Sequence, residues 1–329
     1  MLNILAGTLI IGQVNPWIVH EGQKGPGKGK EIVLLAGDEE YRSEEGLPQL
    51  AKILANRHGF KCTVLFSIDA KGFIDPNCQT NQPGMQALEH ADLCIMQLRF
   101  RNWPDEQMRR FADFYLAGKP IIALRTSTHA FQYPPDSKSE FRKYGWQSTE
   151  WPGGFGEQVL GENWISHWGI HGVQATRGVS VQPEHPILRR VGQIFGTTDV
   201  YEAHPPPDVQ VLLQGQVVSG LNSSDIPATG EKRNSLGVTQ ALNDPMMPIA
   251  WTRIRRNEAG NSNRIFVTTM AAATDLLDEN LRRMLVNATY WGLGMDVPKR
   301  SDVSLVGRYE PSPFGFDKFK RGQRPEDLR

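Results

Sequence analysis

The sequence predicts an α/β fold in which helices cover both faces of a mostly parallel β-sheet. Two observations carry this prediction: continuous apolar runs typical of strands buried on both faces, and amphipathic helical patterns between them. The first strands are expected at residues 31–36, 61–66, 92–98 and 121–124. A strand–helix–strand alternation implies right-handed crossovers, so the carboxyl ends of the parallel strands share one edge of the sheet.

The helices between these strands have recognisable ends. We expect the first helix to start at Ser43, a residue type that caps helices, and to stop at Gly59. Pro104 and Asp105 mark the start of a helix after the third strand. These helices connect neighbouring parallel strands.

The second half of the chain continues the alternation with more irregular segments. Further strands are expected at residues 173–181, 209–218, 248–254 and 264–270. One helix is predicted over residues 274–293, with Leu277 on its apolar face. A long insertion at residues 134–161 contains Trp146 and Trp151, and loops of this length are usually functional or disordered. The tryptophans favour a functional loop.

The chain is expected to form one α/β domain at residues 31–295, after an N-terminal extension at residues 1–30 and before a polar tail at residues 296–329. Residues 1–14 are apolar but lack a basic start and a small-residue cleavage site. These residues are either the remnant of a secretory signal, which would imply a periplasmic location, or an ordinary strand, which would fit a cytoplasmic one. No run is long and apolar enough to span a bilayer.

Composition excludes several classes of function. The chain has 36 basic and 36 acidic residues, and this balance argues against nucleic acid as a partner, which needs a basic excess. The three cysteines, Cys62, Cys78 and Cys94, are an odd number without metal-ligand spacing, so no disulfide framework is implied. We therefore expect a small molecule as the partner, and the composition is also compatible with a homo-oligomer.

The most informative stretch is residues 118–131. Gly-Lys-Pro precedes the strand at residues 121–124, and a sharp turn into a helix is expected directly after it. Ligands of open α/β sheets bind just beyond the carboxyl ends of the strands. Arg125, Ser127 and His129 are therefore expected at a site.

This pattern of Gly-Lys-Pro, two aliphatic residues, a small residue and an elbow is similar to the nucleophile strand of class I glutamine amidotransferases, whose elbow presents a cysteine. Arg125 occupies that position here, and an arginine cannot act as a thiolate nucleophile. The chain resembles the trehalose-utilisation, or ThuA-like, branch of this superfamily over residues 31–295, including the segment Glu184 to Leu188. The resemblance implies a flavodoxin-like, class I glutamine amidotransferase-like domain with long loop insertions.

The same resemblance implies a role in carbohydrate metabolism without amidotransferase activity. The expected partner is a small-molecule carbohydrate, a sugar or keto-sugar derivative, and the expected enzyme is of the hydrolase or isomerase type. A non-catalytic carbohydrate-binding or scaffold protein on the same fold is the alternative, because a fold does not imply a function.

Polar side chains follow the first, third and elbow strands and are expected to meet at one rim. The residues expected to bind substrate are Glu40, Tyr41, Arg99, Arg101, Arg125 and Ser127. Carboxylates accept hydrogen bonds from hydroxyl groups, and guanidinium groups donate to carbonyl, carboxylate or phosphate oxygens. Alternatively, these are loop charges that pair with each other or with water.

Three histidines are candidates for catalysis. His129, with His167 or His171, is expected to act in acid–base chemistry, because histidine titrates near neutral pH. The spacing of His167 and His171 would also suit zinc on a helix, but Gly169 disfavours a helix and no glutamate lies between them. Candidates for a third ligand are His129, His204 and Glu162. We therefore expect no cofactor, with zinc or another divalent metal as the alternative.

Overall fold

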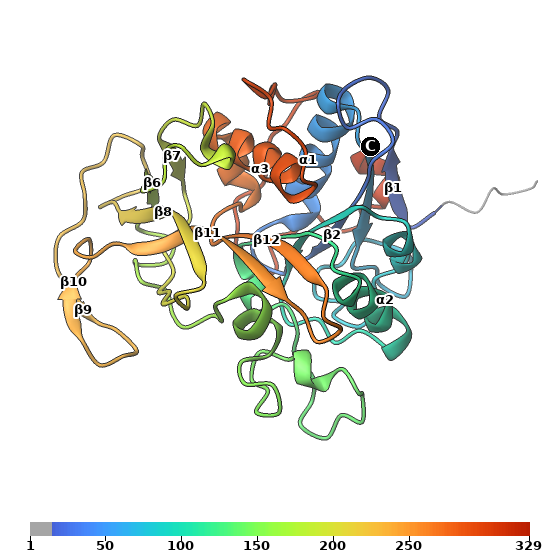
Figure 1. Ribbon diagram of the computed structural model, residues 1–329, viewed down its shortest axis with the longest axis horizontal. Coiled ribbons are helices and arrows are strands. Elements are labelled where there is room, and N and C mark those ends of the chain that lie inside the picture. Colours follow the sequence, from blue (N-terminus) through green and yellow to red (C-terminus); the bar gives the residue numbers. More distant parts are fainter. Residues whose placement is uncertain (1–14) are drawn as a thin grey trace, which may run out of the picture.

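The computed structural model describes residues 15–329, so the alternatives for residues 1–14 lie outside the described part of the chain. Ten strands form one sheet (Figure 1). In chain order they are β1 (Trp17–His20), β2 (Glu31–Gly37), β3 (Lys61–Phe66), β4 (Leu93–Leu98), β5 (Ile121–Leu124), β6 (Thr176–Ser180), β7 (Ile194–Gly196), β8 (Val209–Val217), β11 (Met247–Arg256) and β12 (Ser262–Thr268). Strands β9 (Glu231–Arg233) and β10 (Thr239–Ala241) form a separate hairpin.

The sheet has the order β1-β3-β2-β4-β5-β12-β11-β8-β6-β7. Strands β3, β2, β4, β5 and β12 are parallel to one another, as the apolar runs predicted. The strands from β11 to β7 add an antiparallel extension, and β1 pairs antiparallel with β3 at the other edge. The predicted α/β, flavodoxin-like fold is confirmed, and its parallel part carries the strand exits that build the site.

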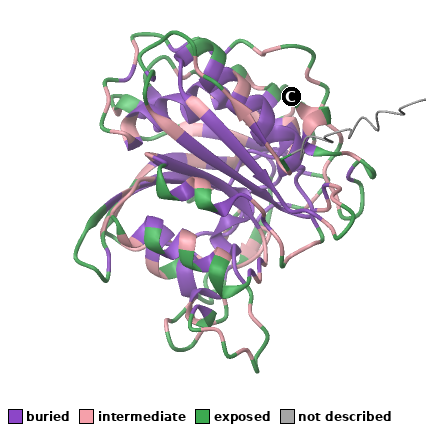
Figure 2. Cartoon of the chain, turned by 90° about the vertical axis from the view of Figure 1, so that its right-hand side faces the viewer, coloured by how far each residue is buried: buried purple, intermediate pink, exposed green. Residues whose placement is uncertain are grey.

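Helices cover both faces of the sheet. Helices α1 (Ser43–His58) and α3 (Glu279–Gly292) pack in one apolar core, and α2 (Asp105–Leu116) packs in the other. Side chains that alternate along β2 enter the two cores in turn, with Leu34 in the first and Leu35 in the second. Figure 2 shows the buried strands between the two layers. Within residues 15–329, no helix combines the length and apolar character needed to cross a membrane.

Helix α1 starts at Ser43 and stops before Gly59, as predicted. Two other local predictions are wrong: the capping role of Ser43 and the continuity of the last helix. The residue before α1 is Arg42, in a left-handed conformation without a side-chain cap, whereas the hydroxyl of Ser43 accepts a hydrogen bond from the Asp38 backbone N–H at 3.1 Å. The helix predicted over residues 274–293 is broken. A 3₁₀ turn, Ala273–Leu277, ends at Asp278, whose extended backbone and side chain cap α3. Leu277 is consequently exposed rather than packed.

Candidate functional site

The elbow after β5 places Arg125 in the centre of the molecule. The chain turns into a 3₁₀ helix, Arg125–His129, rather than an α-helix. Arg125 has a φ of 43°, in the left-handed region that costs a non-glycine residue about 1 kcal/mol. The sharp turn was predicted, and its strain shows that the surroundings hold this side chain firmly in place.

The Arg125 guanidinium is fully buried and bonded to protein groups. Nη1 donates to the backbone carbonyls of Asp199 at 2.8 Å and Thr269 at 2.6 Å. Nη2 donates to Asp199 Oδ1 at 2.9 Å and to the Tyr41 hydroxyl at 3.2 Å. The rings of Tyr41 and Tyr201 lie 4.5 and 3.8 Å from its central carbon. With these contacts Arg125 anchors Asp199, and its binding of a substrate stays a prediction.

Asp199 joins two histidines. His167 Nδ1 lies 2.8 Å from Asp199 Oδ2, and His171 Nδ1 lies 3.0 Å from Asp199 Oδ1. The other ring nitrogen of His171, Nε2, lies 3.1 Å from Glu40 Oε1. Residues from the exit of β2, from the elbow and from two later segments therefore meet at one point. Of the strand exits expected to meet, those of β2 and β5 do, whereas Arg99 and Arg101 after β4 pair with Glu39.

The two histidines are positioned by backbone pairing rather than by a helix. His167 and Tyr201 form a β-bridge, and the Trp168 N–H donates to the Val200 carbonyl at 2.7 Å. This pairing brings His167 against Asp199, and the turn that follows brings His171 back to the same carboxylate. The expectation that Gly169 disfavours a helix is confirmed.

The electrostatic environment between the carboxylates favours a positive charge. Hydrogen bonds that the His171 ring donates to Asp199 and Glu40 outweigh burial and raise the pKa of His171 to about 9. Burial opposes ionisation of Asp199, but hydrogen bonds from His167 and His171, together with Arg125, hold the pKa of its carboxyl well below the usual value. Asp199 is thus a carboxylate that holds its neighbours in a fixed orientation.

The centre is buried on one side and open on the other. The side chains of Asp199 and Arg125 are 0% exposed, whereas those of His167 and His171 are 35% and 34% exposed. The charged base of the site is therefore sealed inside the protein, and the imidazole rings present their outer sides to solvent. A small molecule can reach them without a change of fold.

Aromatic rings border this open side. The Trp164 ring lies 5.8 Å from the His167 ring, and the Phe314 ring lies 5.6 Å from the His171 ring. Phe314 belongs to the C-terminal tail, where the Gly315 N–H donates to the Glu40 carbonyl at 2.7 Å and the Gly315 carbonyl accepts from Arg42 at 2.9 Å. The tail therefore forms one wall of the site, which the sequence did not reveal.

His129 lies beside Trp164 rather than in the centre. It is 3% exposed, and its Nδ1 lies 3.2 Å from the Thr128 hydroxyl. The Trp164 ring contacts both His129, at 5.6 Å, and His167. Burial, and then the charges of Arg99 and Arg125, lower the pKa of His129 well below its ordinary value. Within residues 15–329, no titratable side chain lies within hydrogen-bond reach of His129, so its predicted acid–base role lacks a partner.

Other rim residues bind each other. Glu39 forms ion pairs with Arg101 at 2.8 Å and with Arg99 at 3.5 Å. Arg101 is fully buried and also donates to the Pro76 carbonyl at 3.0 Å. Ser127 donates to the Met96 carbonyl at 2.9 Å and so ties the elbow to β4. For Arg101 and Ser127 these contacts match the alternative of internally paired rim groups, and their substrate-binding role stays a prediction.

Three side chains have the arrangement of a metal site. His167, His171 and Asp199 each offer a ligand atom, and these atoms all lie within 4.8 Å of one another. The third group is thus Asp199, not one of the three residues considered from the sequence. His204 instead pairs with Glu202 at 3.0 Å, and Glu162 accepts hydrogen bonds from the backbone of residues 163 and 204.

The sequence did not identify Asp199 and Tyr201 as site residues, because no motif or periodic pattern includes them. They follow β7, a strand of three residues that is too short to produce a periodic pattern. The available signal was the pair of acidic residues on either side of Val200 and Tyr201, in the segment Asp199-Val200-Tyr201-Glu202.

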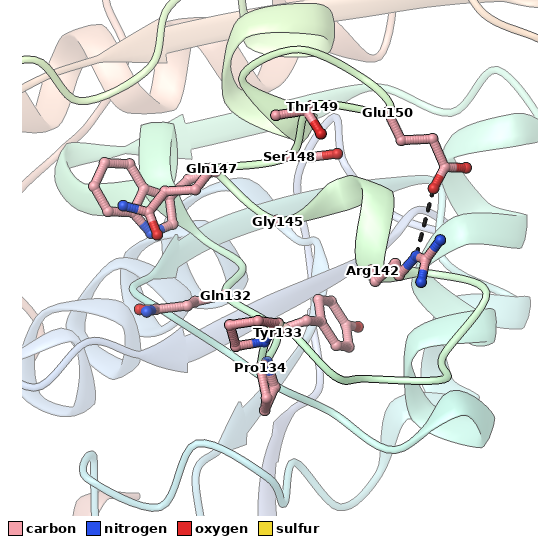
Figure 3. Close-up of a pocket in the computed structure, with 11 residues that line it drawn as sticks. Gln132, Tyr133, Pro134, Arg142, Gly145, Gln147, Ser148, Thr149 and Glu150 are labelled. Carbon is pink, nitrogen blue, oxygen red and sulfur yellow. Dashed lines mark ion pairs between the residues drawn. The ribbon is translucent and has the colours of Figure 1, made fainter.

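A hollow lies beside the centre, in the predicted functional insertion. It has a volume of about 400 Å³ and is lined by residues 132–135, 142 and 145–150 (Figure 3). Its Arg142 and Glu150 form an ion pair at 3.5 Å. Trp146 lines it and also contacts the rings of His129 and Trp164, at 6.4 Å in each case. Aromatic contacts therefore connect the hollow with the histidine centre.

No family model and no curated protein matches this sequence. The solved structures that resemble it include a protein from Parabacteroides merdae described as ThuA-like, at 14% identity and a TM-score of 0.51, covering 87% of this chain and all of the other. A second protein described as ThuA-like, from Bacteroides uniformis, has 14% identity and a TM-score of 0.48, with 84% and 96% of the two chains covered. The glutaminase domain of Trypanosoma brucei CTPS has 9% identity and a TM-score of 0.35, with 83% and 98% covered.

Proposed function

We propose that this chain, whose fold is ThuA-like, is an enzyme of the hydrolase or isomerase type that acts on a sugar or keto-sugar derivative. The observation that carries the proposal is the cluster of His167, Asp199 and His171 at the strand exits, buried at the carboxylate and open at the imidazoles. A side chain that transfers a proton or polarises a carbonyl needs a fixed orientation and access to the substrate. Both conditions are met here.

The surroundings suit a polyhydroxylated ligand. Small-molecule sites combine aromatic walls with a few well-placed polar groups. Trp164 and Phe314 supply such walls, and the Glu40 carboxylate lies beside His171. Apolar ring faces can pack on the C–H faces of a sugar, while its hydroxyl groups bind to carboxylate and imidazole.

We also propose that the chain lacks amidotransferase activity. Arg125 occupies the elbow where that chemistry needs a thiolate. Cys62 and Cys94 are fully buried in β3 and β4, where burial raises the pKa of both thiols far above the usual range. Glutamine is therefore expected to be no substrate of the purified protein.

The proposal is tested by incubating the protein with a panel of disaccharides and keto-sugars and analysing the products by chromatography. We expect turnover of at least one of them, and a loss of about 100-fold or more in His167→Ala, the range for a positioned acid–base group. His204→Ala is the control, since this histidine pairs with Glu202 outside the cluster.

Two outcomes contradict the proposal. Equal turnover by wild type and His167→Ala would place the chemistry elsewhere. If no substrate of the panel is converted while one of them raises the melting temperature of the protein, the non-catalytic binding protein becomes the better account, because a ligand that binds the native state stabilises it.

A further inference from the structure

We propose that His167, His171 and Asp199 bind one divalent ion of a first-row transition metal. The inference concerns the same site as the proposed function and names a cofactor for it. The metal would be bound by Nδ1 of each histidine and by the Asp199 carboxylate, while Glu40 and Arg125 hold these ligands from behind.

The proposed ligand atoms lie close enough together to bind a single ion. Two Nδ1 atoms from one segment approach the two oxygens of a single carboxylate, at 2.8 and 3.0 Å, and the three ligand atoms lie within 4.8 Å of one another. Ligands bound at the usual 2.0–2.2 Å around a four-coordinate metal lie roughly 3.4 Å apart. Small side-chain rotations are therefore enough to accommodate an ion.

Neighbouring side chains hold the proposed ligands in place. Histidine ligands usually donate their other ring N–H to a carboxylate, which fixes the tautomer and leaves the opposite nitrogen free for the metal. Glu40 lies 3.1 Å from Nε2 of His171 and can play this part. Arg125 contacts both the side chain and the backbone carbonyl of Asp199. The carboxylate ligand is thus also fixed from outside.

Charge supports a cation at this point. Glu40 and Asp199 face His171 from two sides, at 3.1 and 3.0 Å from its two ring nitrogens, so two carboxylates surround the proposed metal position. The Arg125 charge, 2.9 Å from Asp199, weakens the attraction for any cation.

The two imidazoles decide which cations fit. Mg²⁺ and Ca²⁺ prefer oxygen ligands and high negative charge, whereas imidazole suits Zn²⁺, Co²⁺, Fe²⁺ and Ni²⁺. A site with two imidazoles and one partly neutralised carboxylate therefore selects transition metals. Three protein ligands and an open outer side also match catalytic sites, which keep one position for water or substrate.

The test is a metal titration of chelator-stripped protein, with Co²⁺ followed by its visible absorption and Zn²⁺ by competition. We expect one Co²⁺ per chain, displaced by Zn²⁺ and not by Mg²⁺. His167→Ala and His171→Ala should each weaken Co²⁺ binding about 100-fold or more, because each removes a direct ligand. Glu40→Gln should weaken it about 10- to 100-fold, the usual effect of an outer partner.

His204→Ala is the matched control. His204, like His171, is a partly exposed histidine hydrogen-bonded to a glutamate, at 3.0 Å from Glu202, and its loss should leave Co²⁺ binding unchanged. Asp199→Asn is less suitable alone, because Arg125 would lose its buried partner. For this reason thermal unfolding of every variant accompanies the titration.

The inference is overturned if the stripped wild type binds neither Co²⁺ nor Zn²⁺, or if folded His171→Ala binds Co²⁺ like wild type. It fails separately from the proposed function. If metal-free protein converts a sugar, the enzymatic activity is established and a role of the metal in it is contradicted. If the protein binds Co²⁺ specifically but converts no sugar, the metal site is established and the proposed activity is contradicted.

Discussion

Two neighbouring glutamates at the exit of β2 have different surroundings. Glu39 and Glu40 are 5% and 6% exposed. The Glu39 carboxylate lies 2.8 Å from Arg101, whose side chain is fully buried, and receives a further hydrogen bond from Gln79 at 3.0 Å. Glu40 lies 3.1 Å from His171, a third of whose side chain is exposed.

A buried carboxylate whose partner is also buried stabilises the fold, whereas one whose partner is partly exposed can take part in binding a ligand. Nη1 of Arg101 donates to the loop at residues 67–78, so this partner of Glu39 is held inside the protein. His171 instead continues to Asp199 and to the open centre. The two glutamates carry the same charge and are buried to nearly the same extent, and they differ in their direct partners and in the contacts that these partners make.

The largest loss of stability is expected when the buried arginine of each network, Arg125 or Arg101, is replaced. Arg125→Met leaves Asp199 buried without its cation, and Arg101→Met does the same to Glu39, so each should lower the free energy of unfolding by about 3–5 kcal/mol. Urea denaturation measures both. Only Arg125→Met should also change the Co²⁺ affinity, because Arg125 contacts the Asp199 ligand and Arg101 does not. An equal change in Arg101→Met would show that the two networks are one.

A smaller effect is expected from the glutamates themselves. Glu39→Gln should lower the free energy of unfolding by about 1–3 kcal/mol, because buried donors of the arginines lose a charged acceptor. Its Co²⁺ affinity should stay that of wild type. Glu40→Gln should show the reverse, with little change in urea denaturation and a loss of Co²⁺ affinity. Identical profiles for the two variants would contradict the distinction drawn between them.

The smallest effect concerns the tail that covers Glu40. Phe314→Ala removes the ring contacts to Tyr41 and His171 but leaves the backbone hydrogen bonds of Gly315. Aromatic pairs contribute about 0.5–1.5 kcal/mol each beyond burial. The melting temperature should therefore fall slightly, while KM for a converted sugar rises more than kcat falls. Phe316→Ala, at a 52% exposed position of the same tail, is the control.

The sequence predicted the parallel part of the fold well, because buried strands such as residues 31–36 leave a continuous apolar pattern. The pattern around Gly-Lys-Pro predicted the elbow, and of the strand exits expected to meet, those of β2 and β5 do so at the centre. It missed the break at Asp278, since the apolar periodicity of a helix does not report one extended residue. The site was predicted only in part. Glu40, His167 and His171 were named, but Asp199 and Phe314 reach the centre through contacts distant in sequence.

Anomalous diffraction from crystals of the purified protein, grown without added chelator, tests the central claim most directly. The account predicts one anomalous peak per chain, about 2.0–2.2 Å from Nδ1 of His167, from Nδ1 of His171 and from the Asp199 carboxylate. Well-ordered His167 and His171 side chains with no peak between them after growth in Zn²⁺, or a peak bound by other residues, would contradict it.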